Sequence, residues 1–179
     1  SQSEYLEFPS LNIQLDDGSL TGDCKMTLTG PYKANFNLNL DHINLQPILS
    51  MLVTLLPAPT EAEANSAIPV ELLSSLSIDG KIAGSAVKIG AEFLIDHMTI
   101  EVSAQEGILQ LNPITLSAYE GGHNCSIALD VTKATPVLKI VEQANNVALE
   151  PWLKLFNLPN TLLGNAEVKI SLDAAGSSF

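Results

Sequence analysis

The residues that could do chemistry are few and widely spaced along this chain of 179 residues. The three histidines, His42, His97 and His123, lie in or beside separate alternating segments, and no two stand at the spacing of metal ligands. We therefore interpret each histidine as an ordinary strand or turn residue rather than as a metal ligand.

Other motifs of catalysis or ligand binding are also missing. Asp16, Asp17 and Asp23 surround two glycines, but their spacing is not that of a calcium loop and a tight turn explains them better. The glycines between residues 80 and 90 do not form a phosphate-binding loop, and no serine stands in a nucleophile elbow. The sequence predicts no catalytic residue, no bound metal and no cofactor, so we expect a protein that is not an enzyme.

The two cysteines, Cys24 and Cys125, lie far apart in the sequence and form no CxxC motif, which gives no support to a zinc or thioredoxin-like site. A single long-range disulfide in an oxidising compartment and two buried free thiols both fit this pattern.

The composition is apolar and acidic at once. Hydrophobic residues make up 46% of the chain and charged residues 16%, with a net charge of −12. The negative charge opposes binding to nucleic acid or direct docking on an anionic membrane surface. No apolar run reaches the roughly 18 residues that would span a bilayer. The high apolar content therefore indicates either a large core or an exposed apolar face.

The segments that would form such a face have a period of two residues, in which apolar and polar side chains alternate. This alternation is typical of half-buried antiparallel strands. It is clearest at residues 24–28, 36–40, 98–102, 125–131 and 168–172. Turn signals separate the runs at Asp16-Asp17-Gly18, Gly30-Pro31, Asp79-Gly80, Glu106-Gly107 and Gly121-Gly122. We predict a mainly β fold: a curved antiparallel sheet, forming an open groove or half-barrel, with two or three short α-helices.

Helical patterns interrupt the alternation at residues 45–56, 69–76 and 149–156, and residues 57–67 form an acidic loop by composition. A strand followed by Leu-x-Pro occurs twice, around Pro47 and Pro151. We interpret residues 1–56 and 68–179 as two related β-plus-helix units, joined by the loop 57–67, that form one continuous domain.

The apolar side of the strands is the candidate functional surface. Either the sheet curls and fills itself, or its face remains a groove that accepts acyl chains. The candidate lipid-facing residues are Phe36, Leu38, Leu40, Phe93, Ile95, Ile100, Val102, Leu109, Leu111, Ile127 and Leu129.

An ordered set of short motifs extends from residue 68 to residue 176. It comprises Pro69-Val70-Glu71-Leu72-Leu73, Asp79-Gly80, Gly107-Ile108-Leu109-Gln110-Leu111-Asn112-Pro113, Tyr119-Glu120-Gly121, Leu129-Asp130, Ala134-Thr135-Pro136 and Pro151-Trp152-Leu153. In its order and spacing this set resembles the C-terminal region of AsmA-family proteins, which are inner-membrane-anchored periplasmic proteins of Gram-negative bacteria.

The resemblance implies a long, open β groove in the periplasm that passes phospholipid toward the outer membrane or influences protein insertion there. It implies no catalytic residues, and its expected partners are phospholipids or other acyl lipids and outer-membrane assembly proteins. Because the chain opens Ser1-Gln2-Ser3-Glu4 without a starting Met, we expect it to be part of a longer, anchored parent. The rival interpretation is a structural or protein-interaction module with a self-filled core.

Overall fold

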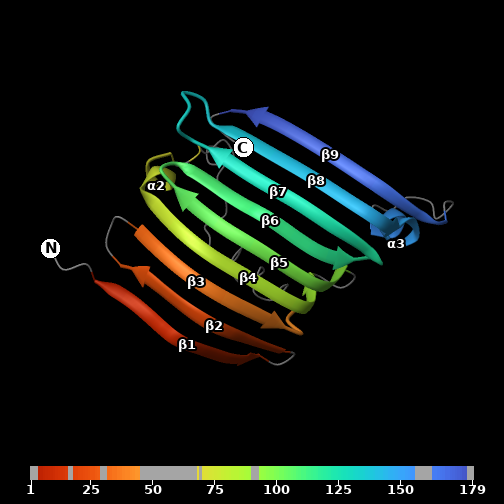
Figure 1. The fold of residues 1–179 in the computed structure, drawn as a ribbon, viewed down its shortest axis with the longest axis horizontal. Helices are drawn as coiled ribbons and strands as arrows, with labels where there is room; N and C mark the ends of the chain where they lie inside the picture. Colours follow the sequence, from red (N-terminus) through yellow and green to blue (C-terminus); the bar gives the residue numbers. More distant parts are fainter. Residues whose placement is uncertain are drawn as a thin grey trace, which may run out of the picture.

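One sheet of nine strands dominates the computed structural model, which describes residues 4–15, 18–28, 32–44, 68, 70–89, 93–155 and 163–176 (Figure 1). The strands are β1 (Tyr5–Leu15), β2 (Gly18–Thr27), β3 (Tyr32–Asp41), β4 (Leu76–Ile89), β5 (Phe93–Gln105), β6 (Ile108–Ala118), β7 (Gly121–Asp130), β8 (Val137–Ala148) and β9 (Asn165–Ala175). Within these described residues two short helices accompany the strands, α2 (Val70–Ser75) and α3 (Leu149–Leu155). The predicted β fold with short helices is confirmed.

The strands lie in the sheet in the order in which they occur in the chain. Consecutive strands pair antiparallel except β3 and β4, which are parallel, with Tyr32 opposite Leu76. The sheet is mainly antiparallel, as predicted, and this parallel pair is the exception, because β4 starts at the end of the sheet where β3 began. All nine strands share this sheet, while the division into two related units stays a prediction.

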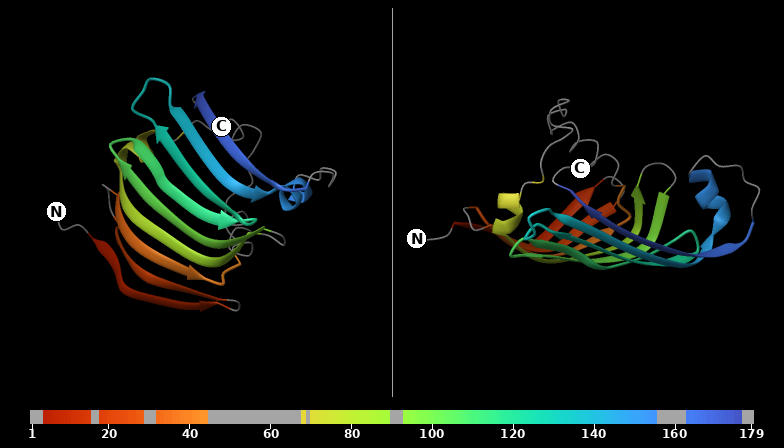
Figure 2. Two further views of the ribbon diagram at one scale, coloured as in Figure 1. Left: turned by 45° about the vertical axis from the view of Figure 1, so that its right-hand side comes forward. Right: turned by 90° about the horizontal axis from the view of Figure 1, so that it is seen from above.

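The sheet is bowed, as predicted, and both described helices lie on its concave side (Figure 2). The buried residue Ile68, just before α2, lines a small pocket with Leu129, Leu138 and Ala174. These three residues belong to β7, β8 and β9 and lie on the apolar side of their strands. The apolar side of the sheet therefore faces the concave side, and β1 and β9 remain separate edges.

Irregular positions keep the apolar residues on one side of the sheet. At a bulge, two successive apolar residues are three positions apart in the sequence instead of two. This occurs from Phe8 to Leu11 in β1 and from Ala144 to Val147 in β8. In β4 the same step surrounds Ala86, whose φ of 51° is left-handed. Such bulges bend a strand and increase its twist, which contributes to the bow of the sheet.

The two described helices begin as the sequence predicts. Each has an acidic residue in its first turn, Glu71 in α2 and Glu150 in α3, where a negative charge is favourable. Pro151 occupies the first turn of α3, where a missing N–H costs little. The predicted helix at 45–56 and the acidic loop at 57–67 lie outside the described residues.

The turn signals were partly correct. Glu106 and Gly107 form the turn between β5 and β6, both with positive φ. The turn before β7 uses Tyr119 and Glu120 instead of the two glycines that follow them. Asp79-Gly80 is not a turn, because it lies inside β4.

Gly80 is required for packing rather than for chain reversal. A Cβ at this position would lie 2.3 Å from two carbons of the Phe36 ring, so that ring lies directly over the glycine on the apolar side of the sheet. Glycine in a strand often marks such a close approach.

The substitution Gly80→Ala should displace the Phe36 ring and lower the free energy of unfolding by about 1–3 kcal/mol, as overpacking does. The matched control is Gly122→Ala, because a Cβ at Gly122 meets no atom within 4 Å. Thermal unfolding should show a loss of about 2–4 °C per kcal/mol for the first variant and little change for the second. Equal melting temperatures would contradict this account.

Candidate functional site

Strand register extends the apolar side of the sheet from one edge to the other. One row of paired residues crosses all nine strands: Phe8, Cys24, Phe36, Gly80, Val102, Leu111, Ile127, Ile140 and Leu172. The neighbouring row runs Leu11, Gly22, Leu38, Ile82, Ile100, Ile114, Cys125, Glu142 and Ile170. We call the surface made by these rows and their neighbours the apolar face.

Ten of the predicted lipid-facing residues lie on this face. Nine of them are only half-buried: Phe36, Leu38, Leu40, Ile100, Val102, Leu109, Leu111, Ile127 and Leu129. The tenth, Ile95, is 4% exposed and packs with Val87 and Met98 in the core cluster. The side chain of Phe93 lies outside what the structure describes. That these residues contact lipid stays a prediction.

The apolar face becomes more exposed toward both edges of the sheet. Val87 is completely buried in the middle, whereas Ile170 and Leu172 in the edge strand β9 are each 47% exposed. Four apolar residues of the other edge strand, β1, are also exposed: Leu6, Phe8, Ile13 and Leu15. The face is therefore filled at its centre and open at its margins.

These edge residues were not among the predicted lining residues. In β9 the alternation of Val168, Ile170 and Leu172 was the signal that would have added these residues to the apolar face. In β1 the bulge between Phe8 and Leu11 hides the alternation. The sequence signal for this strand is a pair of shorter alternating runs, with Leu6 and Phe8 before Pro9 and Leu11, Ile13 and Leu15 after it.

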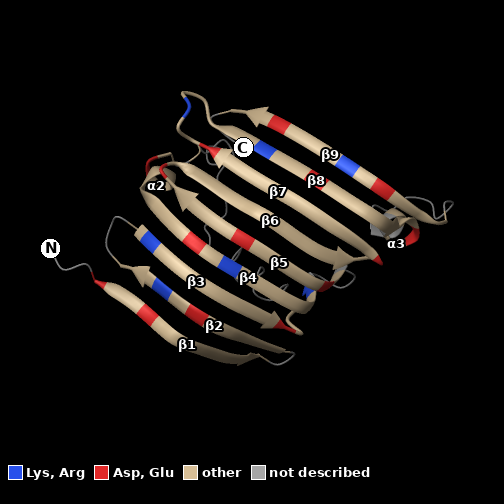
Figure 3. Cartoon of the chain, viewed as in Figure 1, with Lys and Arg blue, Asp and Glu red and all other residues tan. Residues whose placement is uncertain are grey.

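The opposite side of the sheet is polar. Behind the first apolar row, the register aligns Glu7, Lys25, Asn35, Asp79, Ser103, Gln110, Ala128, Lys139 and Asp173. Lys25 Nζ lies 3.1 Å from Glu7 Oε2 and 4.5 Å from the centre of the Tyr5 ring. Charges of both signs are scattered along the strands without gathering into one patch (Figure 3).

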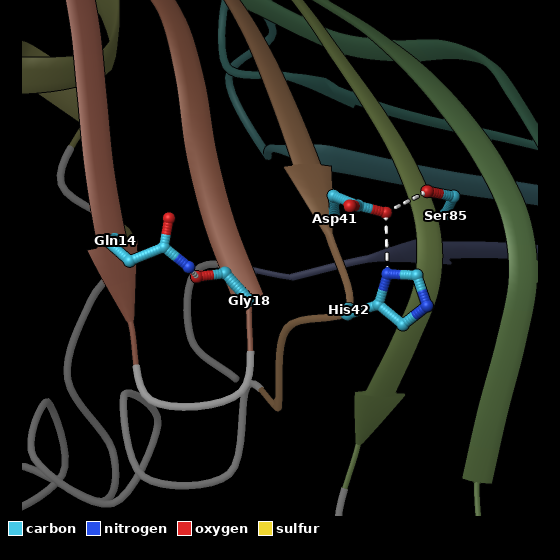
Figure 4. A network of polar contacts seen from close by, with 5 residues as sticks. All are labelled: Gln14, Gly18, Asp41, His42 and Ser85. Carbon is cyan, nitrogen blue, oxygen red and sulfur yellow. Dashed lines mark hydrogen bonds and ion pairs between the residues drawn. The ribbon is translucent and has the colours of Figure 1, made fainter.

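An exposed polar network fastens the end of β3 to β4 (Figure 4). Asp41 Oδ1 accepts a hydrogen bond from Ser85 Oγ at 2.7 Å and lies 2.8 Å from His42 Nδ1. The hydrogen bond from Ser85, and then that from His42, hold the pKa of the Asp41 carboxyl below its usual value. The network supports the one parallel pair of the sheet. Nearby, Gln14 Nε2 donates to Gly18 O at 3.0 Å, which links the end of β1 to the start of β2.

A polar cluster interrupts the apolar face on β7 and β8. His123 Nδ1 lies 2.9 Å from Glu142 Oε1, and these side chains are only 10% and 19% exposed. Burial, followed by a hydrogen bond and charge from Glu142, raises the pKa of the neighbouring Cys125 thiol from 9.0 to about 11. The buried His123 Nε2 atom has no hydrogen-bond partner.

The sequence contained a signal for this cluster that we did not use. Extending the alternation of Cys125, Ile127 and Leu129 backward by one step places His123 on the apolar face. The interpretation of His123 as an ordinary strand residue therefore did not foresee that its side chain lies on the apolar face, paired with Glu142. Among the described residues, no group of three His, Cys, Asp or Glu side chains is arranged to hold a metal ion.

The two cysteines are free. Cys24 belongs to β2 and Cys125 to β7, five strand spacings apart, which corresponds to about 24 Å. A disulfide requires Cα atoms within about 7 Å, so the geometry excludes the predicted alternative of a long-range disulfide.

Neither described helix has the length or the apolar sequence needed to cross a membrane. A sequence model described as "AsmA family" matches residues 69–179, which is more than half of the chain. Neither the curated proteins nor the solved structures include a significant match.

The matched pair Leu38→Asp and Asn37→Asp tests the assignment of the two faces. Leu38 lies half-buried on the apolar face and Asn37 is exposed on the polar face. Because a charge in an apolar contact is costly, we expect Leu38→Asp to lower stability by about 2 kcal/mol or more. This corresponds to a loss of about 4–8 °C in thermal unfolding, whereas Asn37→Asp should change little. Equal melts would show that the register is wrong.

The setting of Cys125 can be tested by alkylating the thiol with iodoacetamide over a range of pH in a Cys24→Ser background. Because Glu142 contributes to the raised pKa of the thiol, Glu142→Gln should lower that pKa and increase the alkylation rate near pH 9. Gln143→Ala, on the polar face of the same strand, is the control. An unchanged pH midpoint in Glu142→Gln would show that the carboxylate does not act on Cys125.

Proposed function

Because this chain belongs to the AsmA family, we propose that it binds the acyl chains of lipids passively along its apolar face during outer-membrane biogenesis. Family membership in general fits outer-membrane assembly or lipid-related roles of a bacterial envelope protein. The proposal adds that this segment works in the periplasm of a Gram-negative cell, as part of an inner-membrane-anchored parent, and that it is not an enzyme.

The observation that carries this proposal is the continuity of the apolar face across nine strands. Eight spacings between neighbouring strands give a width of about 38 Å. Strands of 10–14 residues give a length of roughly 33–46 Å in the other direction. A surface of this size offers apolar contact to whole acyl chains, and a monomeric soluble protein rarely leaves so continuous an apolar surface without a partner.

The mechanism would be a replacement of water by protein. Removing one methylene group from water is worth about 0.8 kcal/mol, so even partial contact along a chain adds up to useful affinity. The contact is non-directional, which allows a chain to slide along the face while the polar headgroup stays in water. The bow of the sheet and the exposed residues at both margins support this mechanism.

A second function is favoured by a different observation. Val87, Ile95 and Met98 form a buried cluster, with Leu40, Ile82, Ile100 and Leu116 packed against it, so part of the apolar face is already covered. A sheet filled in this way could serve as a structural or interaction module that affects the assembly of outer-membrane proteins.

The two functions are separated by a lipid-binding experiment on the purified chain. If the apolar face binds acyl chains, native mass spectrometry should detect co-purified phospholipid and a fluorescent fatty acid should bind. Leu172→Asp should weaken fatty-acid binding several-fold, because it places a charge in the exposed margin of the face.

Ser171→Asp is the matched control, since it places the same charge one residue away on the polar face. Both positions are exposed in an edge strand, so both variants should keep their fold. The absence of both co-purified lipid and fatty-acid uptake would favour the self-filled module, and equal weakening by the two variants would contradict binding on the apolar face.

A further inference from the structure

The apolar face contains one polar cluster that the proposed function does not explain. Among the register partners that make up this face, Glu142 is the only acidic residue, and no lysine or arginine lies there. Polar groups in an apolar setting are costly unless they are paired. The partner of Glu142 on one side, Ile170, is apolar and the partner on the other side is Cys125, so the row itself does not require a carboxylate at this position.

The hydrogen bonding inside the cluster leaves one atom, His123 Nε2, able to accept a hydrogen bond from a ligand. An ionised carboxylate only accepts hydrogen bonds, so His123 Nδ1 is the donor in its 2.9 Å contact with Glu142 Oε1. In the neutral imidazole ring the other nitrogen, Nε2, is then an acceptor. This atom is buried, and no group of the protein donates to it.

The charge of the cluster indicates which kind of donor would fit. The carboxylate of Glu142 receives hydrogen bonds from His123 and Cys125, and with His123 in its neutral form no lysine or arginine of the apolar face lies beside it. The nearest lysines in the register, Lys139 and Lys169, belong to the polar face. A positively charged donor at Nε2 would supply the missing hydrogen bond, and the Glu142 carboxylate on the other side of the imidazole ring would favour its charge. An anionic group would be repelled.

We infer that His123 and Glu142, with Cys125 beside them, form a headgroup site that takes the primary ammonium group of a zwitterionic amino lipid. This inference rests on the proposed function, since the acyl chains must lie on the apolar face beside the site. Leu116, Ile114 and Ile170 are the register partners of His123, Cys125 and Glu142, and they provide the adjoining apolar surface. Glu142 keeps 19% of its side chain exposed, so the headgroup meets this residue first.

The test compares two soluble lysophospholipids that share one acyl chain and differ only in the headgroup. Lysophosphatidylethanolamine carries a primary ammonium with N–H donors, and lysophosphatidylcholine carries a trimethylated ammonium with none. Isothermal titration calorimetry below the micelle concentration should show that the unmodified protein binds the ethanolamine lipid about tenfold more tightly, as one charge-assisted hydrogen bond allows.

The variant Glu142→Gln should lose this preference and bind both lipids with the affinity of the choline lipid. The matched control, Gln143→Glu, adds a carboxylate to the polar face of the same strand and should keep the preference. Equal binding of the two lipids by the unmodified protein, or a preference that survives Glu142→Gln, would overturn the headgroup site and leave the proposed function intact. Binding of neither lipid would overturn the proposed function and the site together.

A spectroscopic measurement on the unmodified protein keeps the inference testable if Glu142→Gln does not fold. In ¹⁵N–¹H spectra of the imidazole rings, the ethanolamine lipid should shift the Nε2 resonance of His123, and the choline lipid should not. His97, which is exposed on the polar face, and His42, which is exposed beyond the end of β3, serve as internal references. A His123 resonance that responds equally to both lipids would refute the ammonium contact.

Discussion

The alternation of side chains in a pleated strand is the constraint on which this structure depends. Because successive residues point to opposite sides, nine strands in register produce one apolar and one polar surface from a single layer. A register slip of one residue in any strand would bring its apolar set to the polar side. The three-residue steps at Phe8–Leu11, Leu111–Ile114 and Ala144–Val147 are therefore as important as the regular pairs, since they preserve the sidedness of the sheet where a strand bends.

The properties of the cluster of His123, Cys125 and Glu142 depend on its position on the apolar face of the sheet. On the polar face, a histidine beside a glutamate would be one of many exposed polar pairs, as Asp41 and His42 are. On the apolar face, the same pair is removed from most water and leaves an imidazole nitrogen without a partner. The chemistry of the cluster therefore comes from the face on which the register places it.

Much of the fold could be predicted from the sequence, because alternation, turn residues and helix starts are local signals. The short helix around Pro151 and the strands with unbroken alternation, including their apolar side, follow from such signals, whereas the bulge in β1 hides its alternation. The parallel pairing of β3 and β4 could not be predicted, because it depends on where a long connection returns the chain. Gly80 was misread as a turn, since its reason is the ring of Phe36, which lies 44 positions earlier in the sequence (80 − 36). The polar cluster needed two strands to be placed side by side, and alternation alone does not reveal that pairing.

The two edge strands of the sheet differ in whether a further β-strand could pair with them. The outer strand β1 contains Pro9 and a bulge, which are common natural guards against strand addition. In contrast, β9 continues through eleven residues without proline, and the extra residues of its irregular pairing belong to β8. Lengthening of the sheet by a further strand is thus favoured on one side only. A strand added at β9 would extend the apolar face beyond this edge, whereas the opposite edge at β1 would remain the end of the sheet.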